Sequence, residues 1–141
     1  MKYVLDASVA LRWVLPHPLA SKAIRLRADF LNQIHELLAP DVFPGEVANA
    51  LTKAERQKMI AVGQALPLIM KILKTPPVLH AYSPLLPRGA QISSQTRSGF
   101  YDCLYVALAE REVCELVTLD DKLVNNLKLQ FPFVVSLASL P

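Results

Sequence analysis

The segment Ser98-Gly-Phe-Tyr-Asp-Cys-Leu-Tyr-Val-Ala-Leu-Ala-Glu-Arg111 carries the most informative pattern in this sequence. From Phe100 to Ala109 every residue except Asp102 is apolar or aromatic. An α-helix that is apolar on all sides is a buried helix, so this segment is predicted to cross the core. An uncompensated charge in such a place costs several kcal/mol. The Asp102 carboxylate is therefore expected to have a partner.

The segments on both sides of this helix alternate between predicted strands and predicted helices. Strands are expected at residues 2–6, 36–39, 78–82, 115–118 and 133–137. Helices are expected at residues 7–11, 19–34, 60–73, 85–94 and 120–127, and a further one begins at Pro44. Pro67 is expected to kink the helix at 60–73. No Asn-Gly or Asp-Gly pair marks a tight hairpin. This alternation predicts an α/β fold, with a parallel sheet of about four to five strands flanked by helices on both faces.

Length and composition indicate one domain that spans residues 1–141. The chain is 52% hydrophobic, but no apolar run reaches the roughly 18 residues of a membrane-spanning helix. Asp6 and Arg12 interrupt the apolar N-terminal residues and no small-residue cleavage site follows, so we expect a mature, cytoplasmic protein. Cys103 and Cys114 lack the spacing of a zinc site or a disulfide framework, and Cys103 is expected to be a small core residue.

The net charge is +3 at pH 7, and the isoelectric point is near 9.0. This mild excess of basic residues permits nucleic-acid binding without demonstrating it. A basic rim around an acidic centre would suit a polyanion that is brought to a metal ion. An ordinary solvated surface accounts for the same charge equally well.

Four acidic residues are expected to meet at one edge of the sheet. Asp6 ends the first strand, Asp120 closely follows the strand at 115–118, and Glu46 and Asp102 each fall in the first turn of a helix. In an open parallel sheet, ligands bind beyond the carboxyl ends of the strands. Taken singly, each acid is also explained as a helix cap, which stabilises a helix by about 0.5–2 kcal/mol, or as a first-turn residue, which stabilises it less through the helix dipole. Taken together, the acids favour a shared site, because a surface cap does not need the apolar surroundings of Asp102.

A divalent cation is the natural partner for such a set of carboxylates. Mg²⁺ takes oxygen ligands, and Mn²⁺ also prefers them. Without a cation, four neighbouring carboxylates would repel one another and raise each other's pKa. With one or two metal ions bound, such a site activates water and stabilises an in-line displacement at phosphorus. The chemistry indicated is metal-assisted phosphodiester hydrolysis.

Four stretches occur in an order that is typical of one known family. They are Val4-Leu-Asp-Ala-Ser-Val9, Ala39-Pro-Asp-Val-Phe-Pro-Gly-Glu-Val-Ala-Asn-Ala-Leu51, Tyr101-Asp-Cys-Leu-Tyr-Val-Ala-Leu-Ala-Glu-Arg111 and Leu116-Val-Thr-Leu-Asp-Asp-Lys-Leu123. Together they resemble the PIN-domain family, and within it the VapC-type toxin ribonucleases. The resemblance implies a PIN-like three-layer domain and a Mg²⁺- or Mn²⁺-dependent endoribonuclease that acts on RNA as the toxin of a VapBC-type toxin–antitoxin pair. It also implies a cognate antitoxin that blocks the site, and a homodimer.

The resemblance also assigns roles to individual residues. The acidic positions of the family, which are catalytic and bind the metal, map onto Asp6, Glu46, Asp102 and Asp120. Thr118 stands where the family places a hydroxyl that supports the metal site. Asn49 either orients the Glu46 carboxylate or is a surface amide of its helix. Ser8 either hydrogen-bonds near Asp6 or caps the helix that follows it.

Two other classes of function are alternatives to a ribonuclease. One is a catalytically silent PIN-like domain that binds RNA or protein. The other, less favoured, is a phospho-receiver-like signalling module, which needs paired acids after its first strand and a lysine after its fifth. Asp6 stands alone and no lysine follows residues 133–135. Trp13 is expected in the core or at an interface, with stacking on an RNA base as the alternative.

Overall fold

The computed structural model describes the whole chain, residues 1–141. Its strands form one sheet in the order β3-β2-β1-β4-β5, and all four pairings between neighbours are parallel. The five strands are β1 (Lys2–Leu5), β2 (Glu36–Pro40), β3 (Val78–His80), β4 (Glu115–Thr118) and β5 (Val134–Ser136). The prediction of a parallel sheet of about four to five strands is confirmed.

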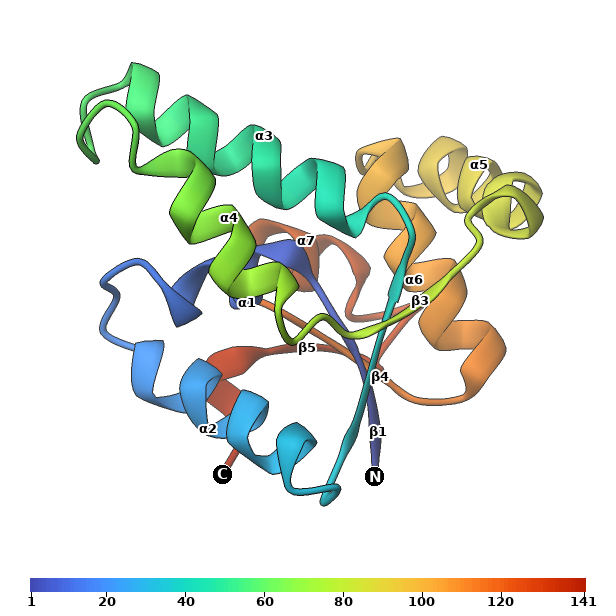
Figure 1. Cartoon of the computed structure of the whole chain (residues 1–141). Helices are drawn as coiled ribbons and strands as arrows, with labels where there is room; N and C mark the ends of the chain where they lie inside the picture. Colours follow the sequence, from blue (N-terminus) through green and yellow to red (C-terminus); the bar gives the residue numbers. More distant parts are fainter.

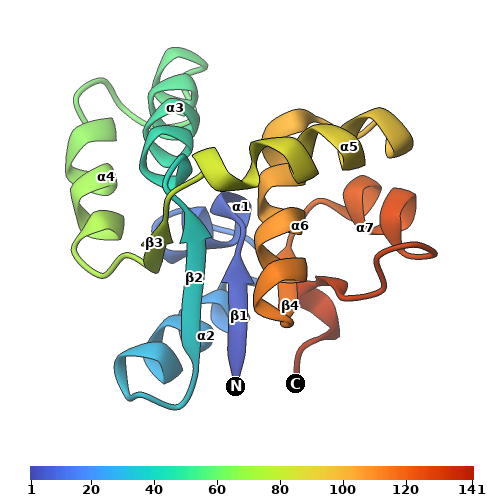
Figure 2. The same ribbon diagram turned by 90° about the vertical axis from the view of Figure 1, so that its right-hand side faces the viewer.

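Helices connect successive strands and cover both faces of the sheet (Figures 1 and 2). The helices are α1 (Ala7–Ala10), α2 (Ala20–Leu31), α3 (Phe43–Arg56), α4 (Ala65–Leu73), α5 (Leu86–Thr96), α6 (Phe100–Glu112) and α7 (Asp121–Leu127). In Figure 2, α6 lies in front of β4 and beside β1, and α2 lies behind the sheet. Helices α3, α4 and α5 stand beyond the carboxyl ends of the strands, away from the two termini. The result is the three-layer arrangement that the alternation of elements predicts. None of the seven helices combines the length and the apolar character that a membrane span requires.

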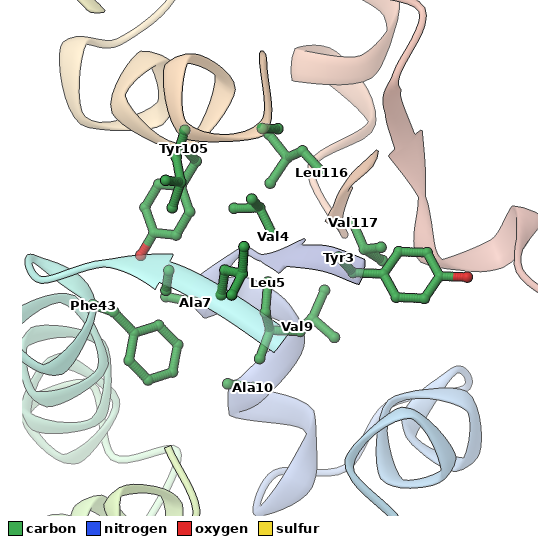
Figure 3. Close-up of a cluster of buried hydrophobic side chains, with 14 of the residues drawn as sticks. Tyr3, Val4, Leu5, Ala7, Val9, Ala10, Phe43, Tyr105, Leu116 and Val117 are labelled. Carbon is green, nitrogen blue, oxygen red and sulfur yellow. The ribbon is translucent and has the colours of Figure 1, made fainter. Parts of the chain in front are cut away.

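Strand β1 lies at the centre of the sheet, and its side chains alternate between the two faces. Val4 pairs with Leu38 of β2 and Leu116 of β4. In Figure 3 its side chain points toward α6, whereas Leu5 lies on the opposite face near Val9 of α1. All of these side chains are buried. Burial on both faces explains why β1 is a continuous apolar run instead of an alternating one.

The helix that dominates the sequence, α6, is buried along most of its length. Every side chain from Cys103 to Ala109 is buried, which confirms both the core helix and the core position of Cys103. The predicted burial is wrong for the first turn, where Tyr101 is 55% exposed. This turn extends past the carboxyl edge of the sheet, so only the later turns of α6 pack on strands.

Two predicted helices differ from those observed. The helix predicted at 60–73 begins only at Ala65, so Pro67 falls in its first turn and causes no kink. Proline is tolerated there because the first-turn amides have no partner within the helix. The helix predicted at 19–34 ends at Leu31, and Gln33 follows with a positive φ of 62°. Ile34, which the helical pattern included, is therefore exposed in the turn that leads to β2.

Trp13 belongs to the core, as the commoner interpretation of a single tryptophan predicts. Its side chain is 5% exposed, and its indole Nε1 donates a hydrogen bond to the Ala23 carbonyl at 3.0 Å. The Arg27 guanidinium lies over the ring, 4.9 Å from its centre. With one edge bonded and one face covered, the ring fixes α2 against the end of the first helical segment and is not available for stacking on a base.

Candidate functional site

The strand order brings the four predicted acids to the same edge of the sheet. Asp6 follows β1, and Asp120 follows β4, which is hydrogen-bonded to β1. Glu46 lies in the first turn of α3, the helix that follows β2 on the other side of β1. Asp102 lies in the first turn of α6, which packs across β1, β2 and β4. Four segments that are far apart in the sequence thus meet beyond the carboxyl ends of three adjacent strands.

Asp6 is the most buried of the acids and is held by two hydroxyls. Its side chain is 9% exposed. Its Oδ2 accepts a short hydrogen bond from Ser8 Oγ and a second one from Thr118 Oγ1 at 3.0 Å. Burial raises the pKa of the Asp6 carboxyl, the two hydroxyl bonds oppose this rise, and repulsion from Asp120 adds to it. Ser8 therefore orients Asp6, and the prediction that it caps the helix is wrong because Asp6 itself occupies the N-cap position of α1.

Thr118 links Asp6 to Asp120. It is fully buried at the end of β4, where its hydroxyl donates to Asp6 and accepts a hydrogen bond from the Asp120 backbone N–H at 3.0 Å. Asp120 is exposed and caps α7, because its Oδ1 accepts from the Leu123 backbone N–H at 3.1 Å. The capping interpretation thus holds for one oxygen of Asp120. The Thr118 hydroxyl thus contacts both acidic residues, and its support of a metal ion stays a prediction.

Glu46 is held by a tyrosine from α6. The Tyr105 hydroxyl donates to Glu46 Oε1 at 2.7 Å, and Figure 3 shows the Tyr105 ring extending from α6 toward the end of β2, where α3 begins. Burial raises the pKa of Glu46, the tyrosine hydrogen bond opposes the rise, and repulsion from Asp6 and Asp102 adds to it. Asn49, predicted either to orient Glu46 or to be a surface amide, is exposed one turn further along α3.

The Asp102 carboxyl is also perturbed by burial and by its acidic neighbours. Burial, followed by repulsion from Asp6 and Asp120, raises the pKa of Asp102 to about 6. Asp102 also repels Glu46. Each of the four acids is therefore close enough to at least two of the others to be repelled by them. The compensating partner expected for Asp102 is not a basic side chain, since none of the ion pairs in the structure involves these four acids.

The charges and donor atoms of this site fit a divalent cation. Carboxylate oxygens are the ligands that Mg²⁺ and Mn²⁺ prefer, and the repulsion among them is what a bound cation would relieve. No three His, Cys, Asp or Glu side chains, however, converge closely enough to hold a metal ion in this structure. The donor set therefore fits a cation in charge and type, while the side chains as placed do not form a closed coordination shell.

Comparison with known proteins places the chain in a family. The PIN domain family matches residues 3–127, which include all four acids. This chain belongs to the PIN-domain family. Over 138 residues this PIN domain is 30% identical to Ribonuclease VapC3 from Pyrobaculum aerophilum, with 96% of this chain and 99% of the relative covered. The recognition of a PIN domain of VapC type from its four stretches is confirmed.

Two solved structures share the fold of this PIN domain. The crystal structure of PAE2754 from Pyrobaculum aerophilum has a TM-score of 0.71 at 22% identity and covers 99% of this chain and 94% of that chain. The structure of VapBC2 from Rickettsia felis, bound to a DNA fragment from their promoter, has a TM-score of 0.66 at 15% identity, with 96% and 97% covered. At sequence identities this low, both similarities show a shared fold and nothing about function.

Tyr105 is the residue of this PIN domain's site that sequence reasoning missed. In the sequence pattern it is only one of the aromatic residues of a buried helix. Its phenol was nevertheless a signal, because a buried tyrosine hydroxyl usually finds a hydrogen-bond partner. Its spacing of three residues from Asp102 also places both side chains on neighbouring positions of α6.

Replacing Tyr105 with phenylalanine should raise the pKa of Glu46 further. The substitution removes the one hydrogen bond that lowers this pKa, while burial and the repulsion by Asp6 and Asp102 remain. The expected result is a titration of Glu46 at higher pH than in the parent, measured by NMR of its carboxyl carbon. Replacing the exposed Tyr101 with phenylalanine is the matched control and should leave the titration of Glu46 unchanged. Equal Glu46 pKa values in the Tyr105 variant and the parent would contradict the role given to the phenol.

Proposed function

We propose that this PIN domain is a divalent-metal-dependent endoribonuclease. Its catalytic, metal-binding residues would be Asp6, Glu46, Asp102 and Asp120. The observation that carries the proposal is the placement of four carboxylates at the carboxyl edge of the sheet, where each is repelled by at least two of the others and none has a partner in an ion pair. The similarity to Ribonuclease VapC3 supports RNA as the substrate class.

The chain's own residues have separate roles in this proposal. Ser8 and Thr118 fix the Asp6 carboxylate in one orientation and favour its ionised form. Tyr105 does the same for Glu46. When bound at such a set of carboxylates, Mg²⁺ or Mn²⁺ supplies a Lewis acid that polarises water and a phosphate oxygen.

We further propose a cytoplasmic toxin of a toxin–antitoxin pair, formed by one domain over residues 1–141. A cognate antitoxin and a homodimer are the partners that the resemblance of the four sequence stretches to VapC-type toxins implies. Exposed apolar side chains on two helices also support a protein partner, since a covered surface would hide them from water. These side chains are Ile24 and Leu31 on α2, and Leu66 and Met70 on α4.

The proposal is tested by incubating the purified protein with a mixed pool of structured RNAs in Mg²⁺, Mn²⁺ or EDTA. The test variant is Asp6→Asn, and the matched control is Asp121→Asn, which makes the same change at an exposed acid beside the site. We expect cleavage only with metal, loss of cleavage in Asp6→Asn and normal cleavage in Asp121→Asn. Circular dichroism checks that both variants are folded.

Each other outcome has a defined meaning. Cleavage that persists in EDTA, or in folded Asp6→Asn protein, would rule out the metal-dependent site. Absence of cleavage with any RNA, together with metal binding by calorimetry, would favour the alternative of a catalytically silent PIN domain that binds RNA or protein.

A further inference from the structure

A hollow of about 250 Å³ adjoins the acidic site on the side of α7. Asp102 and Asp120 line one part of it, and Arg97 and Lys122 line another. Its only hydrophobic lining residue is Leu123. The hollow therefore combines two of the four proposed metal-binding acids with two cations and little apolar surface, which suits a charged ligand rather than an apolar one.

The two cations have no ionic partner in the protein. Both side chains are exposed, and neither takes part in any ion pair of the structure. The arginine guanidinium presents a planar fork of N–H donors that matches phosphate oxygens, and the lysine ammonium adds a point charge. In a bound polyanion, one phosphate would lie at the four acids and their proposed metal ion. The two unpaired cations beside these acids are suited to bind the next phosphate.

The loop that carries Arg97 is fixed to two helices. Ser93 Oγ of α5 donates to the Ser98 carbonyl at 2.7 Å. From α7, Asn126 Nδ2 donates to the Thr96 carbonyl at 2.9 Å and to Ser98 Oγ at 2.7 Å. These bonds hold the backbone on both sides of Arg97, so the arginine projects from a rigid support instead of a free loop.

The backbone at Arg97 is in the left-handed region, with φ 61° and ψ 20°. Glycine is the usual residue there, because other residues are disfavoured by their Cβ. An arginine at this position is a local outlier that its neighbours hold in place.

We propose that this hollow binds the RNA phosphate adjacent to the scissile one, with Arg97 and Lys122 as the residues that hold it. This inference rests on the proposed ribonuclease function. Contacts to phosphates position a nucleic acid without reading its sequence. The two residues therefore set the register of the strand over the carboxylates and contribute affinity for all RNA sequences alike. Asn126 acts through the loop and is a positioning residue.

The test measures binding of a short labelled single-stranded RNA to Asp6→Asn protein in Mg²⁺, at several salt concentrations. Into this non-cleaving background we would introduce Arg97→Gln with Lys122→Gln, or Lys128→Gln as the control. Lys128 carries the same charge at the other end of α7 and does not line the hollow. We expect the double variant to bind RNA at least tenfold more weakly, with a salt slope lower by about 0.7, since the hollow holds one phosphate and each phosphate contact on a single strand contributes about 0.7. The Lys128 variant should retain the affinity of its background.

A second variant, Arg97→Gly, distinguishes a loss of RNA binding from a loss of folding. Glycine adopts the left-handed backbone easily, so this variant should melt at the same or a higher temperature while still losing RNA affinity. In the cleaving protein, the same substitutions should raise KM more than they lower kcat, as expected for a contact made equally in the ground and transition states. Unchanged affinity and salt slope in both the double variant and Arg97→Gly would overturn the inference and leave the ribonuclease intact. If the parent neither binds nor cleaves RNA, the proposed function fails first and the inference fails with it.

Discussion

Replacing Asp102 with asparagine is expected to stabilise the metal-free protein at pH 7 by about 1–2 kcal/mol, and at the same time to abolish RNA cleavage. Burial and two neighbouring acids raise the pKa of Asp102 from 3.8 to about 6. Each unit of pKa difference corresponds to about 1.4 kcal/mol, and the effect is smaller for Asp102 because its side chain is partly exposed and solvent screens its charge. Asparagine keeps the shape of the side chain and removes the charge.

The effect should depend on pH in a defined direction. Because the folded-state pKa of Asp102 is above its ordinary value, the stability that this group contributes is fully present below about pH 4. It is lost as the pH rises through about 6. The parent should therefore lose stability between these values in EDTA, and Asp102→Asn should lose less. Urea unfolding at pH 4.5 and pH 7 measures the loss of stability in the parent and in Asp102→Asn. The control is Asp121→Asn, in which removal of an exposed charge should change stability by about 0.5 kcal/mol or less.

This outcome would separate a functional carboxylate from a structural one. A helix cap or first-turn acid stabilises the fold, so its removal lowers stability. If Asp102→Asn unfolds more easily than the parent at pH 7, Asp102 serves the fold and the metal-site interpretation of it is wrong. A more stable protein that no longer cleaves RNA is the expected signature of a charge kept for function.

Replacing Thr118 with valine is expected to destabilise the protein by about 1–3 kcal/mol, the usual cost of buried polar groups left without a partner. Valine has nearly the same shape but lacks the hydroxyl that is bonded on two sides. Asp6 Oδ2 would lose one of its two hydroxyl donors and keep the one from Ser8, and the Asp120 N–H would lose its acceptor at 3.0 Å. Cleavage should also fall, because two of the four acids lose the group that joins them.

The matched control for this prediction is Thr52→Val. The Thr52 hydroxyl bonds only to carbonyls of its own helix, with Ala48 O at 2.9 Å, so its loss should change stability by about 0.5 kcal/mol or less. Urea unfolding of both variants gives the comparison. A second variant, Thr118→Ser, keeps the hydroxyl and should restore most of the cleavage. Equal unfolding midpoints for Thr118→Val and the parent would show that the hydroxyl does not support the site.

Much of the fold could be predicted because the apolar pattern of each segment indicates which of its faces are buried. The all-apolar pattern of α6 requires burial on every side, and the continuous apolar run of β1 requires helices on both faces of the sheet. The failures lie where local pattern and tertiary contact disagree. Tyr101 is as aromatic as its neighbours, but its turn extends past the sheet and leaves it exposed. Pro67 suggested a kinked long helix, whereas the helix begins two residues before it.

The sequence by itself determined that this protein is an α/β domain with a buried helix, and it placed each acid at the end of a strand or the start of a helix. Only the tertiary structure decided which groups meet those acids. Thr118 and Asp6 are separated by 112 positions in the chain, and Tyr105 and Glu46 by 59. Their hydrogen bonds depend on β1 lying between β2 and β4 and on α6 crossing all three strands. Strand order is set by the packing of the whole core, and the periodicity of a single segment, which reflects only its own burial, cannot specify it.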